Sequence, residues 1–255
     1  MGALANYPSL RDQCVFITGG ATGIGAALVK AFAQQGAKVA FVDVDADSAN
    51  NLIAVLEAES LTQLWFQEVD VTDSDALQKT IENADGALGP LNILINNAAN
   101  DMRQAPADVT TKSWRDCMAI NLDAAFFAAQ AAARLMRERD GGSIINFSSI
   151  NALLGPGNMP GYVTAKAGVV GLTKALARDY GSDKVRVNAI LPGWVATERQ
   201  LQSWLTPDEE ANWMQQVALQ TRLMPEDVAN LALFLAATDS KMITGQSFII
   251  DAGRT

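Results

Sequence analysis

Apolar and polar positions divide the chain into short apolar runs and longer segments with helical periodicity. The runs CVFIT (14–18) and AKVAFVD (37–43) contain hardly any polar residue, which is typical of strands buried on both faces. The segment PEDVANLALFLAA (225–237) begins with a proline and spaces its apolar residues as an amphipathic helix does. These patterns predict strands at 14–18, 37–43, 61–70, 91–99, 141–149, 184–193 and 246–253. They predict helices that end near residue 35 and lie at 46–59, 73–88, 111–138, 160–180 and 225–237.

The alternation of strands and helices predicts a parallel sheet that helices cover on both faces. Right-handed crossovers then give a doubly wound Rossmann fold with about seven strands. No linker, repeat or low-complexity segment interrupts the pattern. We therefore expect a single α/β domain over residues 1–255 that binds a dinucleotide and carries the catalytic site.

One long insertion, at about 194–224, follows the sixth predicted strand. Ligands of this fold bind beyond the carboxyl ends of the strands, so the insertion is predicted to be a lid over the substrate. It contains Trp194, Trp204 and Trp213. A packing or oligomer surface is an equally open reading for the outer tryptophans.

The charge of the chain excludes some partners. The net charge of −9 opposes binding to nucleic acid or to an anionic membrane surface. No apolar run reaches transmembrane length, and the first twelve residues lack the pattern of a signal peptide. The two cysteines, Cys14 and Cys117, are far apart and fit reduced thiols. We expect a cytoplasmic protein.

The chain contains no histidine, and this limits the chemistry that it can perform. Hydrolases with a Ser-His or Cys-His pair and metal sites with histidine ligands are excluded, and no metal site is expected. A proton must then be transferred by Tyr, Lys, Asp, Glu or Cys. Tyr162 and Lys166 lie four residues apart in GYVTAKAG, which places both on one face of a predicted helix. The spacing alone also fits two ordinary surface side chains.

A glycine-rich stretch, TGGATGIG (18–25), connects the first predicted strand to the first helix. Glycines at such a turn let the backbone approach a pyrophosphate at the helix N-terminus. Asp43 ends the second predicted strand, where an acid can accept both ribose hydroxyls and repel a 2′-phosphate. The residues that follow it include no Lys or Arg, which favours NAD over NADP. Asp43 could instead begin a helix cap, and Asp70 is predicted to end the third strand near the adenine.

In order and spacing, these motifs resemble the short-chain dehydrogenase/reductase family over essentially the whole chain. The resemblance is carried by TGxxxGIG, NNAA (96–99), Asn121, Ser149 thirteen residues before Tyr162, and LPGWVAT (191–197). It implies that Tyr162 accepts the proton and that Ser149 holds the substrate oxygen. It further implies that Lys166 binds the nicotinamide ribose and lowers the pKa of Tyr162, and that Asn121 holds a water on the proton path.

The same resemblance and the glycine-rich loop together predict the residues around NAD. They are Gly19, Thr22, Gly23, Ile24, Gly25, Asp43, Val44, Asp70, Val71, Asn97, Ala98, Ala99, Tyr162, Lys166, Pro192, Gly193, Val195 and Thr197. Members of the family usually form tetramers through two long helices, which correspond to 111–138 and 160–180. We expect a homotetramer on that ground.

Several stretches resemble a subgroup of aldose 1-dehydrogenases, among them NNAANDMR (96–103) and LPGWVATERQ (191–200). This implies oxidation of a sugar at its anomeric carbon to a lactone. The subgroup often has Asp-Asp-Arg-His after the NNA segment, where this chain has DMRQ (101–104). The predicted substrate contacts are Asn100, Arg103, Ser149, Asn151, Tyr162 and Trp194. A carbonyl or 3-ketoacyl reductase, a dehydrogenase of polyols or secondary alcohols, and a cofactor-binding regulator without turnover are the alternatives.

Overall fold

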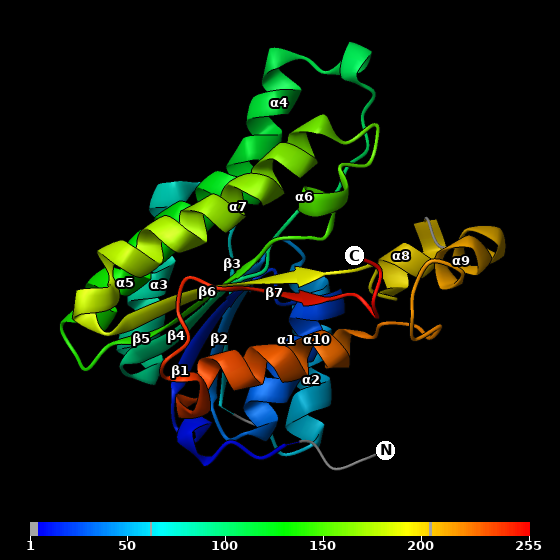
Figure 1. Cartoon of the computed structure of the whole chain (residues 1–255). Coiled ribbons are helices and arrows are strands. Elements are labelled where there is room, and N and C mark those ends of the chain that lie inside the picture. The colour runs from blue at the N-terminus through cyan, green and yellow to red at the C-terminus, as the bar shows by residue number, and fades with distance from the viewer. Residues whose placement is uncertain (1–4, 62, 204–205) are drawn as a thin grey trace.

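A computed structural model describes residues 5–61, 63–203 and 206–255, and it contains one seven-stranded parallel sheet. The strand order is β3-β2-β1-β4-β5-β6-β7, as the doubly wound prediction requires (Figure 1). The strands are β1 (Cys14–Thr18), β2 (Lys38–Asp43), β3 (Leu64–Glu68), β4 (Leu91–Asn96), β5 (Gly142–Phe147), β6 (Val185–Pro192) and β7 (Ser247–Ile250).

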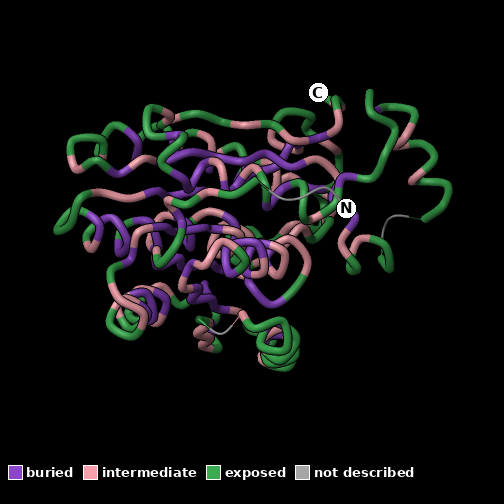
Figure 2. The backbone as a smooth tube through the Cα atoms, turned by 90° about the horizontal axis from the view of Figure 1, so that it is seen from below, coloured by how far each residue is buried: buried purple, intermediate pink, exposed green. Residues whose placement is uncertain are grey.

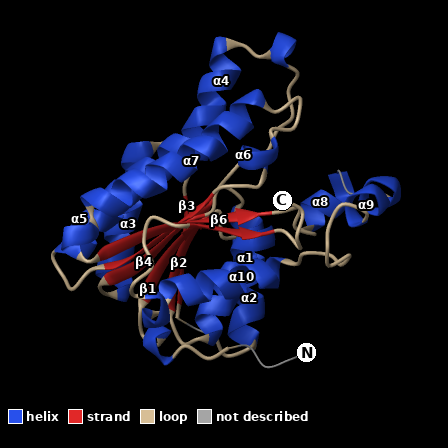
Figure 3. Ribbon diagram, viewed as in Figure 1, coloured by secondary structure: helices blue, strands red, loops and turns tan. Residues whose placement is uncertain are grey.

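Helices cover both faces of the sheet (Figure 3). One face carries α1 (Gly23–Gln34), α2 (Ala46–Ala58) and α10 (Pro225–Ala236). The other face carries α3 (Ser74–Leu88), α5 (Ala124–Arg137) and α7 (Pro160–Asp179). The remaining α-helices are α4 (Thr111–Met118), α6 (Asn151–Leu154), α8 (Glu198–Ser203) and α9 (Pro207–Met214). Short 3-10 helices lie at Pro8–Leu10, Pro106–Asp108, Gly181–Asp183 and Thr238–Ser240.

The burial of strand β1 on both faces explains why its sequence has no alternation of polar and apolar residues. All five of its residues are buried, because alternate side chains enter different cores. Val15 and Ile17 pack with α1 and α10, whereas Phe16 packs with α3 and α5. Figure 2 shows the same pattern for the whole sheet, with buried backbone at the centre and exposed backbone on the outer helices and loops. The two cores fix the sheet, and its carboxyl edge can then carry irregular loops.

The predicted helix at 111–138 is not a single α-helix. Its α-helical parts, α4 and α5, are separated by a π-helical segment, Ala119–Asp123. Asn121 lies in this segment, and its side-chain amide donates to the Cys117 carbonyl at 3.0 Å. That carbonyl lies four residues earlier, where a regular α-helix would pair it with the Asn121 N–H. The side chain therefore competes with the regular helical hydrogen bond.

Several predicted strands extended too far into the loops at their carboxyl ends. The fourth ends at Asn96 rather than at residue 99, and the fifth ends at Phe147 rather than at 149. The third ends at Glu68, so Asp70 lies two residues beyond it. Within the described residues, no helix has the length and apolar character needed to cross a membrane.

Candidate active site

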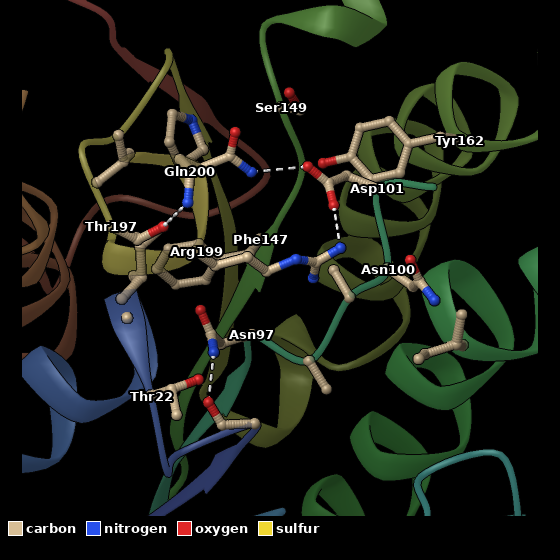
Figure 4. A pocket seen from close by; sticks show the side chains of 18 of the residues that line it. Thr22, Asn97, Asn100, Asp101, Phe147, Ser149, Tyr162, Thr197, Arg199 and Gln200 are labelled. Atoms are coloured by element: carbon tan, nitrogen blue, oxygen red, sulfur yellow. Dashed lines mark hydrogen bonds and ion pairs between the residues drawn. The ribbon is translucent and has the colours of Figure 1, made fainter. Parts of the chain in front are cut away.

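A cleft of about 1230 Å³ lies along the carboxyl edge of the sheet. Its lining includes Asp43 and Asp70, which follow β2 and β3, and Trp194, which follows β6. Ser149 and Tyr162 also line it, and Figure 4 shows them near Asp101. The cleft brings together every predicted cofactor and substrate contact except Gly25. Of the four predicted catalytic residues it contains three, since Asn121 lies outside its lining.

The glycine-rich turn is tightly packed against the loop after β4. Gly19 has φ +67°, and a Cβ on it would lie 2.9 Å from the Ala98 Cα. A Cβ on Gly25 would lie only 1.8 Å from the Gly19 carbonyl oxygen. Gly25 therefore serves the close packing of the turn, and its predicted contact with the cofactor stays a prediction.

Asn97 and Thr18 hold the turn in place. The Thr18 hydroxyl accepts the Asn97 N–H at 3.0 Å and the Ala98 N–H at 3.1 Å. The Asn97 side-chain amide donates to the carbonyls of Thr18 and Gly19 at 3.1 and 2.9 Å. These four bonds join the first and fourth strands where a dinucleotide would cross between them.

Asp43 faces the cleft from the end of β2. Its Oδ2 accepts the Ala21 N–H at 3.0 Å, and its Oδ1 accepts the Asp45 N–H at 3.1 Å. The N-cap of α2 is Asp45, which accepts the Ser48 N–H, so the cap reading of Asp43 does not hold. A carboxylate has about four lone-pair sites, and each oxygen of Asp43 can therefore accept one further hydroxyl. The lining segment 43–55 contains no Lys or Arg.

Lys166 is buried at the opposite end of the cleft, with 2% of its surface exposed. Its ammonium donates to the Phe147 carbonyl at 2.8 Å and lies 5.7 Å from the centre of the Tyr162 ring. Burial lowers the pKa of Lys166 to about 8. The carbonyl bond fixes the ammonium beside the phenol, one helical turn away.

The groups around Tyr162 act on its phenol in both directions. Burial, followed by the negative charge of Asp101, raises the pKa of Tyr162 to about 12. A hydrogen bond with Ser149 and the positive charge of Arg199 oppose that rise. The Ser149 hydroxyl also accepts the Asn151 N–H at 3.1 Å, which orients it. A base that works near neutral pH therefore needs more stabilisation of the phenolate than the Ser149 hydrogen bond and the Arg199 charge supply.

Asn121 is one layer behind the cleft. It is 2% exposed and lines a separate cavity of about 120 Å³ together with Cys117 and Trp114. Its Oδ1 accepts the Asn100 N–H and its Nδ2 donates to the Asn100 carbonyl, both at 3.0 Å. Asn121 thus holds the backbone of a loop that lines the cleft.

Two residues of the cleft that the sequence did not single out are Arg199 and Gln200. Asp101 accepts from Arg199 Nη2 and from Gln200 Nε2, both at 2.8 Å, as the dashed lines in Figure 4 mark. Gln200 in turn accepts from the Trp194 indole N–H at 2.7 Å. The available signal was their place just after Thr197, on the segment that leaves β6.

Trp194 belongs to an aromatic cluster within the insertion. Its ring packs edge-to-face on Trp213 with the centroids 5.4 Å apart, and the Arg254 guanidinium lies 5.5 Å from the Trp213 centroid. The third tryptophan of this segment, Trp204, lies outside the described residues. Trp194 and Trp213 both line the cleft, so this part of the insertion faces the site.

The shape of the cleft fits a dinucleotide. An acidic acceptor stands at one end, backbone turns at the middle, and a buried lysine beside a tyrosine at the other end. Its volume exceeds the range of about 300–1,000 Å³ that is usual for sites of small ligands.

The sequence matches the family described as enoyl-(acyl carrier protein) reductase over residues 19–255. It is 45% identical to "Probable galactose dehydrogenase GalD" of Rhizobium meliloti, across 98% of this chain and 97% of that protein. It is 41% identical to a D-xylose 1-dehydrogenase of Caulobacter vibrioides, across 98% of each chain. A solved short-chain dehydrogenase/reductase of Serratia marcescens superposes with a TM-score of 0.88 at 33% identity, covering 96% of this chain and 99% of that one. With this sequence match, fold and constellation of residues, the chain is a dehydrogenase of the short-chain dehydrogenase/reductase family, whose members use NAD or NADP.

Proposed function

We propose that the protein is an NAD-dependent sugar dehydrogenase that oxidises an aldose at the anomeric carbon to a lactone. The observation that carries the reaction type is the meeting of Tyr162, Lys166 and Ser149 in the cleft that has Asp43 at its other end. The substrate class is supported by relatives that are named for galactose and D-xylose and that match this chain over nearly its full length.

Asp43 supports the choice of NAD. Its two oxygens face the cleft with acceptor capacity left, which suits two ribose hydroxyls. A 2′-phosphate would bring negative charge against this carboxylate, and the segment 43–55 offers no basic residue to offset it.

Each catalytic side chain has a separate task in the proposed reaction. A cyclic aldose carries one hydrogen and one hydroxyl on its anomeric carbon, and removal of a hydride and a proton leaves a lactone. When bound, NAD supplies the hydride acceptor. Ser149 donates a hydrogen bond to the hydroxyl oxygen, and Tyr162 takes the hydroxyl proton. Lys166 supports the phenolate through its positive charge and binds the ribose next to the nicotinamide.

Asn121 acts through another residue in this proposal. It holds both backbone groups of Asn100, and it lies one layer behind the cleft beside Tyr162. A water on the proton path to Lys166, as the family resemblance implies, is compatible with that place. The segment 194–224 acts as the substrate lid, with Trp194 as a platform for an apolar sugar face.

The decisive experiment is a screen for NADH formation with aldoses, polyols and secondary alcohols at pH 7–9, with NADP in parallel. We expect aldoses to be the best substrates and NAD to be preferred. Reduction of ketones or 3-ketoacyl compounds without oxidation of any aldose would refute the sugar dehydrogenase and favour the alternative reductase. No turnover with any compound would favour a regulator.

Assembly and location complete the proposal. We expect a homotetramer in the cytoplasm, with contacts through the α4–α5 region and α7. Light scattering tests the assembly, and a monomer would refute it.

A further inference from the structure

The loop after β4 and helix α8 meet at Asp101. Arg199 and Gln200 each donate to a different oxygen of the Asp101 carboxylate, at 2.8 Å. We call these three residues the Asp101 network. Asp101 lies 98 residues before Arg199 and 99 before Gln200, so the network joins two remote segments that both line the cleft (Figure 4).

The network ties α8 to the loop after β4. Neither α8 nor α9 has a buried residue among those described, and the apolar packing of α9 includes Trp213 against Ile150, Ala189 and Leu191. Figure 1 shows both helices beyond the ends of β6 and β7, away from the sheet. The Gln200 Oε1 also accepts a hydrogen bond from the Trp194 indole N–H at 2.7 Å. One carboxylate is therefore connected to α8 directly and, through Gln200, to an aromatic ring in the site.

Asp101 retains capacity to bind a ligand. Its side chain is 28% exposed, and it lines the cleft together with Tyr162 and Ser149. Each carboxylate oxygen has two acceptor positions, of which the network occupies one. One acceptor position per oxygen remains, which is the arrangement that a pair of neighbouring hydroxyls can use.

We propose that Asp101 determines substrate specificity: its carboxylate, oriented by Arg199 and Gln200, accepts hydrogen bonds from hydroxyl groups of the substrate next to the carbon that is oxidised. This inference rests on the proposed function and names a subsite of the same cleft. Arg199 and Gln200 are positioning residues, because they act on the substrate through Asp101.

The charge of the subsite selects the class of substrate. A carboxylate at the mouth of the cleft accepts hydroxyl protons, and it repels a substrate that carries a phosphate or carboxylate nearby. Arg199 neutralises part of this charge but also fills part of the acceptor capacity. The subsite therefore favours neutral polyhydroxylated molecules over anionic acyl-carrier substrates.

The test compares variants of Asp101 with analogues of the sugar. Of D-galactose and D-xylose, the better substrate is chosen as the parent sugar. kcat/KM is then measured for it and for analogues that each lack one of its hydroxyls. Asp101→Ala should lower kcat/KM for the parent sugar by about 10- to 100-fold, the usual effect of a hydrogen bond to a charged group. For wild-type protein, one particular deoxy analogue should have a kcat/KM that is lower than that of the parent sugar by a similar factor. For that analogue, Asp101→Ala should have the same kcat/KM as wild type.

A matched control removes an acid of a similar ion pair far from the site. Asp140 pairs with Lys184 on the surface, and Asp140→Asn should leave kcat/KM unchanged. If Asp101→Ala lowered kcat/KM relative to wild type by the same factor for the parent sugar and for every analogue, direct binding of a hydroxyl would be overturned. Unchanged kinetics of Asp101→Ala would overturn the proposal entirely.

Failure of the proposed function is distinguishable, because it concerns the wild-type protein. If wild-type protein oxidises no aldose, the sugar dehydrogenase is refuted. The same variants are then compared on a neutral polyol and on a monohydric alcohol of similar size. Asp101→Ala should lose the preference for the polyol, and an unchanged preference would overturn the role of Asp101 as well.

The pH profile tests the positioning residues. The charged or titratable groups that face Tyr162 are Asp101, Arg199, Cys117 on α4 and Lys166 on α7. Asp101 raises the pKa of Tyr162 and Arg199 lowers it. Asp101→Asn should therefore move the rising limb of kcat/KM to lower pH, and Arg199→Gln should move it to higher pH. Shifts in the same direction, or none, would show that Arg199 serves only to hold the loop.

Discussion

The side chain of Asn121 is hydrogen-bonded to both backbone groups of Asn100, the N–H and the carbonyl, each at 3.0 Å. A side-chain amide thus takes the place of a neighbouring strand at the point where the chain leaves β4. The loop that it holds carries Asn100 and Asp101 into the cleft. A residue outside the cleft therefore holds part of the cleft wall in place.

Asn121→Ala should cost stability and activity together. It leaves two backbone groups of Asn100 without their partner, which costs about 1–3 kcal/mol in the free energy of unfolding. Asn188 is a matched control, because it is also buried and bonds the backbone of Gln246 and Ile243, far from the cleft. Denaturant unfolding should give similar losses for both alanine variants, whereas KM should rise only for Asn121→Ala. Equal kinetics of the two variants would remove the loop-holding role.

Tyr162→Phe removes one oxygen from the proposed base. We expect kcat to fall by about 10²- to 10⁴-fold, the range of general acid–base catalysis, with little change in melting temperature. Tyr180→Phe makes the same chemical change on the end of α7 away from the cleft and should retain full activity. Turnover of Tyr162→Phe within tenfold of wild type would show that another group is the base.

Asp43 should control the choice between NAD and NADP. Asp43→Asn removes the charge but keeps an acceptor for the Ala21 N–H, so the turn should stay in place. We expect the ratio of kcat/KM for NADP to that for NAD to rise at least about tenfold, which corresponds to about 1.4 kcal/mol. Asp45→Asn, at the N-cap of α2, is the control and should leave the ratio unchanged. An unaltered ratio in Asp43→Asn would contradict the ribose role.

The burial of Lys166 predicts a dependence of stability on pH. Its pKa falls from 10.5 to about 8 on folding, so between these values the unfolded chain binds more protons than the folded one. The contribution of Lys166 to stability therefore rises with pH across that window, and its cost near pH 7 is about 3 kcal/mol.

Lys166→Met removes that dependence, and unfolding of both proteins without cofactor at pH 7 and pH 9.5 measures it. The free energy of wild type relative to the variant should increase by about 2 kcal/mol from the lower to the higher pH. Lys174→Met removes an exposed lysine from the same helix and controls for the lost charge. Parallel curves for wild type and Lys166→Met would show that the ammonium is not desolvated as its burial implies.

Gly25→Ala should damage the dinucleotide turn. The added methyl would lie 1.8 Å from the Gly19 carbonyl oxygen, so the backbone must move. We expect loss of stability and a weaker affinity for NAD, measured by calorimetry. Gly86→Ala on α3 meets no atom within 4 Å and should be neutral or stabilise by about 0.5–1 kcal/mol. Normal NAD affinity in Gly25→Ala would contradict the close packing of the turn.

The sequence predicted those features that depend on local pattern. The central strands were found because strands buried on both faces, such as β1, have continuous apolar runs. The edge strands β3 and β7 are less buried, and they were found from short apolar runs between helical segments. The glycine-rich turn, Asp43 and the Ser149–Tyr162–Lys166 set were found because motif and spacing are visible in the chain itself. Their meeting in one cleft then follows from the parallel sheet, whose carboxyl ends share one edge.

The features that were missed depend on contacts between remote segments. Asp101 and Arg199 pair across 98 residues, and nothing near either position indicates the partner. The interruption between α4 and α5 likewise accompanies the bonds of Asn121 to Asn100, 21 residues away, while the local sequence has ordinary helical periodicity. The shift of the Tyr162 pKa to a higher value comes first from burial and then from Asp101, and both depend on contacts that the local sequence does not show.

The π-helical segment Ala119–Asp123 changes the rotation of α4 about the helix axis relative to α5. Each residue of an α-helix turns the chain by about 100°, so a deletion of one residue here would restore regular winding and rotate α4 against α5 by about that angle. Trp114 and Cys117 would then point away from the wall that they form behind Tyr162. A change in the length of this stretch would therefore disturb the whole of α4, whereas a substitution acts only at its own position, and alignments of related chains should keep the stretch free of gaps.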